Sequence, residues 1–171
     1  GQGYIQTTPI QLCLMTAQIA NGGYKIYPKI TTEDDNKEFQ RDKYTPLYQN
    51  SKNIKIVQDA MFGSTNEVMG TSYRSRIDDP KYQFAGKTGT AQVKKITEKD
   101  RELDLKTFEI PYEERDHALY IAFGPYKNPR YALSIIVEHG GNGSTTAAPM
   151  AKELFKLIID RHSLRQSINN K

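Results

Sequence analysis

One short run combines a cation, two hydroxyl groups and a missing side chain: Lys87, Thr88, Gly89 and Thr90. On an extended strand, Lys87 and Gly89 would face one side and the threonines the other, so a twist or bulge must decide which groups converge. The absent side chain of Gly89 would let another backbone approach closely. An ammonium beside threonine hydroxyls could hold a carboxylate, and an edge strand could pair with an extended peptide. The run therefore suggests a site for a peptide that ends in a carboxylate.

The same residues also have plainer interpretations. Lys-Thr-Gly is a common tripeptide, and taken alone it is more typical of a turn or a solvated strand end. A phosphate-binding loop is excluded, because that motif requires glycine five residues before Gly86, where the chain has Lys81. The flanking segments must therefore decide between the alternatives.

The first half of the chain predicts two helices. Thr8 and Pro9 suit the start of one, and apolar residues then recur at helical spacing until Gly22-Gly23. A short strand is predicted over 24–30, and residues 33–50 form a polar surface excursion. A second helix is predicted over 52–62. Its apolar face comprises Ile54, Val57, Ala60 and Met61.

The second half predicts strands. Residues 82–93 are extended, and 117–123 and 131–138 form an antiparallel hairpin around a separator rich in Gly and Pro. Residues 94–116 hold 14 charges among 23 positions, which indicates a solvated connection. An amphipathic helix closes the chain at about Arg161. Its apolar residues are Ala147, Met150, Ala151, Leu154, Phe155, Leu157 and Ile158.

These elements predict an α+β fold, with three antiparallel strands and packed helices that include a C-terminal helix. Residues 1–162 form the domain and 163–171 a polar tail. The net charge of +4 is scattered among acids, which argues against a nucleic-acid partner. Cys13 is the single cysteine, and His117, His139 and His162 lack the spacing of a metal site, so we expect no disulfide, metal or cofactor. The histidines are expected at strand or helix ends.

Several segments, in a fixed order, resemble the transpeptidase domain of class B penicillin-binding proteins, above all their elongation-type members. The Lys87 strand is similar to the third motif of that family over eight positions, from Gly86 to Val93. The ordered combination is far more specific than any one segment and covers nearly the whole chain. The other segments are Gly1-Gln2-Gly3-Tyr4, Thr8-Pro9-Ile10-Gln11, His117-Ala118, Ile121 to Pro125, Asn128-Pro129, Val137 to Gly141 and Ala147 to Ala151.

The resemblance implies the penicillin-binding transpeptidase fold, which is related to that of serine β-lactamases, with the chain as its C-terminal portion. It implies that Lys87, Thr88 and Thr90 bind the carboxylate of a peptidoglycan stem peptide ending in D-Ala-D-Ala, or of a β-lactam. The backbone N–H of Thr90 would face the oxyanion. The implied reaction is acyl transfer through a serine ester, which releases D-alanine and then forms a peptide cross-link.

The resemblance also implies a cellular setting. The domain would face the periplasm from the bacterial inner membrane, held by an anchor outside this chain. A glycan-polymerising membrane protein of the elongation machinery would be its partner. No apolar run in the sequence approaches the length of a membrane span, and the chain begins at Gly1, so it is interpreted as a piece of a longer protein.

The serine nucleophile of the family is absent from the chain, because no serine is followed by lysine three residues later. Ser64-Thr65-Asn66 fits the family's second motif, Ser-x-Asn, but it lies after Gly1-Gln2-Gly3-Tyr4 instead of before it. We expect these residues to cap or turn the chain as part of a loop. Ser167-Ile168-Asn169 also fits, but it lies in the polar tail and is dismissed.

Three other functions remain open. A β-lactamase-like hydrolase or a D,D-carboxypeptidase could carry the same strand, although the segments at 1–4 and 8–11 argue against both. A non-catalytic β-lactam sensor is the third alternative. The family's first two strands would precede this chain, so the outer edge of 131–138 is expected to lack a strand partner.

Overall fold

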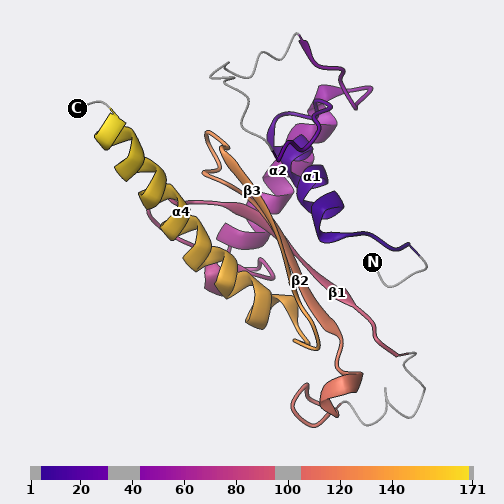
Figure 1. The fold of residues 1–171 in the computed structure, drawn as a ribbon. Coiled ribbons are helices and arrows are strands. Elements are labelled where there is room, and N and C mark those ends of the chain that lie inside the picture. Colours follow the sequence, from indigo (N-terminus) through magenta and orange to yellow (C-terminus); the bar gives the residue numbers. More distant parts are fainter. Residues whose placement is uncertain (1–4, 31–42, 95–104, 170–171) are drawn as a thin grey trace.

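The computed structural model describes residues 5–30, 43–94 and 105–169. Its sheet has the antiparallel order β1-β2-β3. The strands are β1 (Ala85–Ala91), β2 (His117–Gly124) and β3 (Tyr131–Val137), and the helices are α1 (Pro9–Ala20), α2 (Ser51–Asn66) and α4 (Ala148–Asn169). The helix α4 runs along one side of the sheet, with α1 and α2 on the other (Figure 1). The predicted α+β fold and its hairpin are confirmed.

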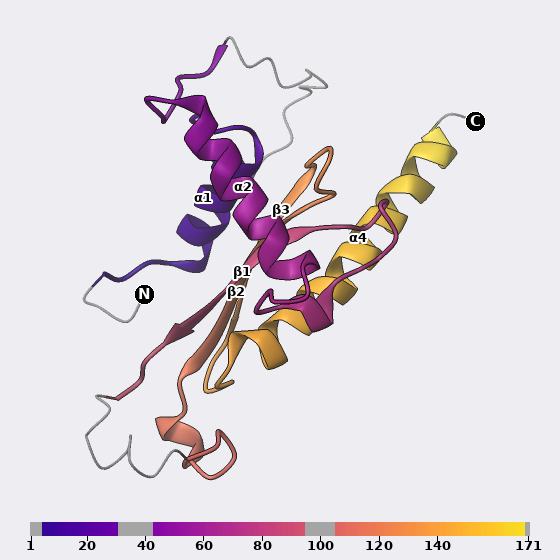
Figure 2. The same cartoon turned by 180° about the vertical axis from the view of Figure 1, so that it is seen from behind.

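The faces of β2 explain why helices cover both sides of the sheet. Tyr120 and its even-numbered neighbours lie in a core with Phe84 and with Phe155 of α4. Phe123 lies in a second core with Met61 of α2. Side chains alternate along a strand, so an apolar run such as β2 must be covered on both faces. The view from behind shows α2 crossing the sheet on the side away from α4 (Figure 2).

The first helix begins at the residues that the sequence indicates, and the second begins at Ser51, one residue before its predicted start. Thr8 forms a capping box with Gln11 at the start of α1, and Pro9 occupies the first turn. Asn50 caps α2 through its side chain. However, α2 continues to Asn66 instead of ending at Phe62, and α4 continues to Asn169 instead of ending near Arg161. The start of the predicted polar tail is therefore helical.

The strand predicted over 24–30 is wrong. The only strand-like pairing of this segment in the described residues is an isolated bridge between Tyr24 and Pro46, and the segment belongs to no sheet. The exposed fractions of Tyr27 and Ile30 are 70% and 103%, so the apolar alternation of the segment has no surface to cover. The excursion predicted over 33–50 falls largely outside the described residues.

The predicted helix faces are only partly correct. Val57 and Ala60 of α2 are exposed, although Met61 is buried. On α4, Ala151, Phe155 and Ile159 are buried and Ile158 is half-buried, while three large apolar side chains of the predicted face are open to solvent. Those exposed side chains are Met150, Leu154 and Leu157. No helix in the described ranges is long and apolar enough to cross a membrane.

The outer edge of β3 has no strand partner among the described residues, as expected. Helix α1 packs against β3, and the Cys13 thiol lies 3.5 Å from the Ala132 carbonyl oxygen. Burial raises the pKa of this thiol, which is therefore a neutral packing group. The edge itself stays open to pairing.

The Tyr120 hydroxyl joins the sheet to α2 and to the segment that follows it. It lies 2.9 Å from both the Thr65 and the Ser72 hydroxyl oxygens, and all three side chains are fully buried. Burial raises the pKa of Tyr120, although the hydrogen bonds with Ser72 and Thr65 oppose the shift. A Cβ placed on Gly86 would lie 2.3 Å from the Tyr120 hydroxyl oxygen. Only glycine therefore fits above this ring.

Gly86→Ala should consequently destabilise the fold by about 2–3 kcal/mol, because the new methyl group overpacks the Tyr120 ring. Gly89→Ala is the matched control on the same strand: its Cβ would meet only the Leu119 Cβ, at 3.3 Å, and should change stability by less than about 1 kcal/mol. Urea-induced unfolding measures both changes. Equal losses in the two variants would contradict the role given to Tyr120.

Candidate active site

The Lys87 strand lies at the edge of the sheet, as β1 pairs with β2 on one side only among the described residues. The Lys87 ammonium donates to the Thr88 carbonyl oxygen at 2.8 Å and to the Thr88 hydroxyl oxygen at 3.2 Å. The long lysine side chain thus turns over the strand edge and reaches a hydroxyl that starts on the opposite face. Of the two threonines of the strand, Thr88 is therefore the one whose hydroxyl meets the Lys87 ammonium.

The same contact indicates which backbone groups are open. In an antiparallel ladder, the N–H and C=O of one residue point to the same side, and this side alternates along the strand. Because the Thr88 carbonyl accepts a hydrogen bond from Lys87, we infer that it faces the free edge of β1. The backbone N–H and C=O of Thr90, two residues on, then face that edge as well. An extended ligand could pair with both residues.

A backbone segment of the chain itself approaches β1 closely at Gly89, but the missing side chain that permits this approach is that of Gly143, since a Cβ on Gly89 would meet only the Leu119 Cβ. A Cβ on Gly143 would lie 2.8 Å from the Gly89 carbonyl oxygen and 2.5 Å from the Leu119 carbonyl oxygen. Gly143 begins a π-helical turn, Gly143–Ala147, that leads into α4. The backbone before α4 therefore supports the strand from the side of the sheet that carries this helix.

Two hollows meet at Lys87. One, of about 930 Å³, extends along β1 from Lys87 to Gln92 and is also lined by Thr8 and Gln11 of the first helix. The other, of about 730 Å³, lies over α2 and is lined by Val57, Met61 and Met69, among others. Lys87 lines both. Among the described residues that line the two hollows, Lys87 is the one lysine or arginine, so its ammonium is available to an anion in either.

Ser64-Thr65-Asn66 forms the last turn of α2 instead of a loop, which corrects the expectation. The Asn66 amide donates to the carbonyl oxygens of Phe62 and Phe84, at 3.0 and 2.9 Å. Thr65 is buried against Tyr120. These contacts give Asn66 and Thr65 structural roles, but they join the end of α2 to the sheet segment instead of capping or turning a loop.

The sequence did not indicate Thr71, whose hydroxyl oxygen lies 3.4 Å from that of Thr88 and 3.1 Å from that of Ser64. Thr71 is 17 residues from Thr88 and belongs to no recognisable motif. Its position depends on how the segment after α2 folds back. The structure thus adds Thr71 and Ser64 to the neighbourhood of the predicted strand.

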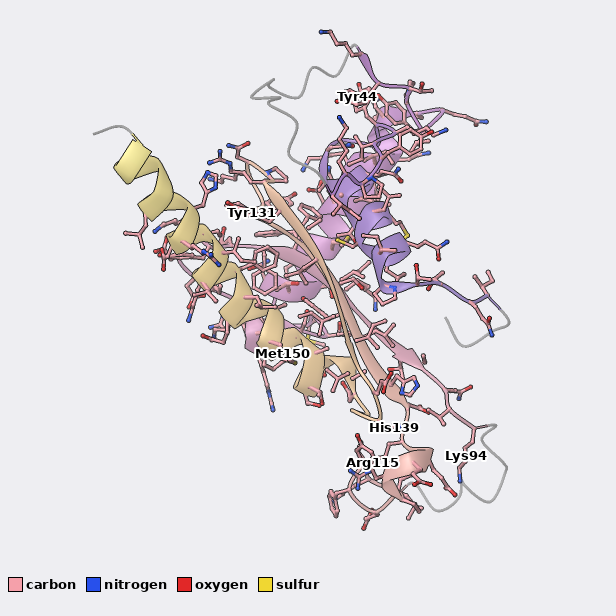
Figure 3. The ribbon with its side chains drawn as sticks, in the orientation of Figure 1. Tyr44, Lys94, Arg115, Tyr131, His139 and Met150 are labelled. Atoms are coloured by element: carbon pink, nitrogen blue, oxygen red, sulfur yellow. The ribbon has the colours of Figure 1, made fainter. Side chains whose placement is uncertain are left out.

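Two of the histidines lie at strand ends, as expected. His117 opens β2, and its Nδ1 accepts a hydrogen bond at 2.9 Å from the backbone N–H of His139, which follows β3. His139 lies beside Arg115 at the same end of the sheet (Figure 3) and has a positive φ of 54°. His162 lies within α4, so its predicted place near a helix end is wrong.

The family model described as "Penicillin binding protein transpeptidase domain" matches residues 1–156. Peptidoglycan D,D-transpeptidase MrdA of Salmonella typhimurium is 34% identical over 166 residues, which cover 94% of this chain and 26% of the relative. The chain therefore spans about a quarter of that protein.

Two solved structures are similar in fold and sequence. PBP2 of Pseudomonas aeruginosa, in complex with WCK 5153, has a TM-score of 0.68 and 33% identity, and the match covers 92% of this chain and 31% of that one. PBP2 of Helicobacter pylori, in complex with MreC, has a TM-score of 0.65 and 32% identity, with 92% and 26% covered. The chain belongs to the transpeptidase domains of penicillin-binding proteins, and within them to the PBP2 and MrdA type.

Proposed function

We propose that the chain is part of a peptidoglycan D,D-transpeptidase that cross-links stem peptides through a serine acyl-enzyme. The observation that carries the proposal is the convergence of the Lys87 ammonium and the Thr88 hydroxyl on the free edge of β1. A carboxylate accepts hydrogen bonds from both kinds of donor, and an ammonium makes the stronger, charge-assisted bond. The nucleophile must come from outside these 171 residues, since none of their serines precedes a lysine by three positions.

The lysine and the two threonines of the strand each have a role in this proposal. Lys87 and Thr88 bind the terminal carboxylate of the D-Ala-D-Ala peptide, and Thr90 contributes a further hydroxyl. The peptide lies along the edge and pairs with the backbone of Thr88 and Thr90. The N–H of Thr90 then stabilises the oxyanion of the tetrahedral intermediate. Gly143, which has no side chain, lets its backbone lie against the strand at Gly89.

A β-lactam is the second ligand in the proposal, because its carboxylate and acyl group imitate those of the peptide. Penicillin-binding protein A of M. tuberculosis has been solved as a ceftriaxone acyl-enzyme complex, and it is 25% identical to this chain with a TM-score of 0.61. The relative from H. pylori forms a complex with MreC. These relatives support the proposal that this protein binds β-lactams and works in a cell-wall assembly.

We extend the proposal to the cellular setting. The site faces the periplasm, where stem peptides are accessible, and the protein is held at the inner membrane by a segment outside this chain. A glycan-polymerising membrane protein acts beside it, because cross-linking requires newly made glycan strands. The family membership of the chain supports both statements.

The first test is covalent labelling with a fluorescent penicillin. The chain of 171 residues should remain unlabelled, because it has the carboxylate-binding strand without the serine. The longer protein that includes the upstream catalytic segment should be labelled, as shown by fluorescence after denaturing electrophoresis. Labelling of the short chain would refute the absence of a nucleophile. An unlabelled longer protein, folded by circular dichroism, would refute the proposed function.

The second test removes the cation. In the longer protein, Lys87→Ala should lower the second-order rate constant of penicillin acylation about 10- to 100-fold, since one hydrogen bond to a charged group is lost. Lys81→Ala is the matched control, because Lys81 bonds to Asp160 at 2.8 Å and lines neither hollow that Lys87 does. Stopped-flow fluorescence gives both rates. Equal rates in the two variants would rule out the role assigned to Lys87.

The third test separates the alternatives by their products. A transpeptidase given a donor stem peptide and an acceptor amine releases D-alanine and forms a cross-linked dimer, which mass spectrometry detects. A D,D-carboxypeptidase would yield only the shortened peptide, and a β-lactam hydrolase would turn over penicillin. A sensor would form a lasting penicillin adduct with neither peptide product. The proposal requires the dimer.

A further inference from the structure

A line of hydroxyl groups runs from the end of α2 to the Lys87 strand. The Ser64 and Thr71 hydroxyl oxygens are 3.1 Å apart, and the Thr71 and Thr88 hydroxyl oxygens are 3.4 Å apart. The Lys87 ammonium completes the line, 3.2 Å from the Thr88 hydroxyl oxygen. Ser64, Thr71 and Lys87 all line the hollow over α2. The line therefore ends at the groups that we propose to bind a carboxylate.

Thr71 is held in place by both of its neighbours. A Cβ on Gly70 would lie 2.4 Å from the Ser64 carbonyl oxygen, so the backbone is pressed against the last turn of α2. Ser72 donates its N–H and its hydroxyl to that same carbonyl oxygen, at 3.0 Å each. Ser72 also bonds to the Tyr120 hydroxyl. The backbone on both sides of Thr71 is thus held by a buried network, although the Thr71 side chain itself is exposed.

The donors and acceptors available to each group determine which hydroxyl donates to which along the line. A hydroxyl has one hydrogen to donate and two lone pairs that accept. The Lys87 ammonium can only donate, so it occupies one lone pair of the Thr88 oxygen. A bound carboxylate can only accept, so it takes the hydrogen of Thr88. The Thr71 hydroxyl can then meet Thr88 only as a donor to its second lone pair.

We propose that Thr71 is a positioning residue: its hydroxyl donates to Thr88 and so keeps the Thr88 hydrogen directed at the ligand carboxylate. Ser64 in turn donates to Thr71 and leaves the Thr71 hydrogen for Thr88. The inference rests on the proposed function, because it assigns a supporting group to the same site. Thr71 touches no reacting atom and acts only through Thr88.

The test is a double-mutant cycle in the longer protein with Thr71→Val, Thr88→Val and the combined variant. Thr71→Val should lower the second-order rate constant of penicillin acylation about 3- to 10-fold, as expected for one neutral hydrogen bond. Thr71→Ser keeps the hydroxyl and should restore the rate to within about twofold. In the Thr88→Val background, Thr71→Val should have no further effect, because the residue through which it acts is gone.

Thr45→Val is the matched control, since Thr45 is also exposed and lines neither hollow. It should leave the acylation rate and the thermal midpoint unchanged. An unaffected Thr71→Val variant, or an equal loss in both Thr88 backgrounds, would refute the inference while the wild-type protein still labels. A wild-type protein that neither labels nor cross-links peptides would refute the proposed function and this inference together.

Discussion

The buried hydroxyl of Tyr120 is the interaction on which the arrangement of the site depends. It connects the central strand to Thr65 of α2 and to Ser72, which are seven residues apart in the chain. Leaving a phenol unpaired in the core would be costly, so the helix end and the following segment are both held against the sheet. Gly86 must lack a side chain for the ring to fit. The Tyr120 hydroxyl thus holds the sheet, the end of α2 and the segment that carries Thr71 together.

Much of the fold could be predicted from the sequence, because its strongest patterns reflect burial on two sides. The apolar runs in 117–123 and 131–138 correspond to the two cores that cover β2 and β3. Residues 24–30 also contain tyrosines and isoleucines, interleaved with lysines, but form no strand. Local sequence does not reveal whether a partner strand is available, and Tyr27 and Ile30 find none among the described residues. The exposed Val57 of α2 was likewise predicted to be buried.

The residues of the candidate site also fall into those that the sequence predicts and those that it does not. Lys87 to Thr90 could be identified because the motif and its flanking segments occur in a fixed order. Thr71 could not, since its contact with Thr88 depends on a turn that places Gly70 and Ser72 against the end of α2. Nothing in its spacing marks it. Groups that act through another side chain are defined by packing, and packing is what a single sequence describes least.

The contact between Gly143 and Gly89 has a consequence for how the protein can vary. The two backbones touch where β1 pairs with β2. A side chain at Gly143 would meet the backbone carbonyl oxygens of Gly89 and Leu119, which cannot move without shifting their strands. Any larger residue there would displace the strand from behind. In the proposed site, the ligand-facing edge would shift although none of its own atoms had been replaced. Altered sensitivity to an inhibitor could therefore arise from a residue that never contacts the drug.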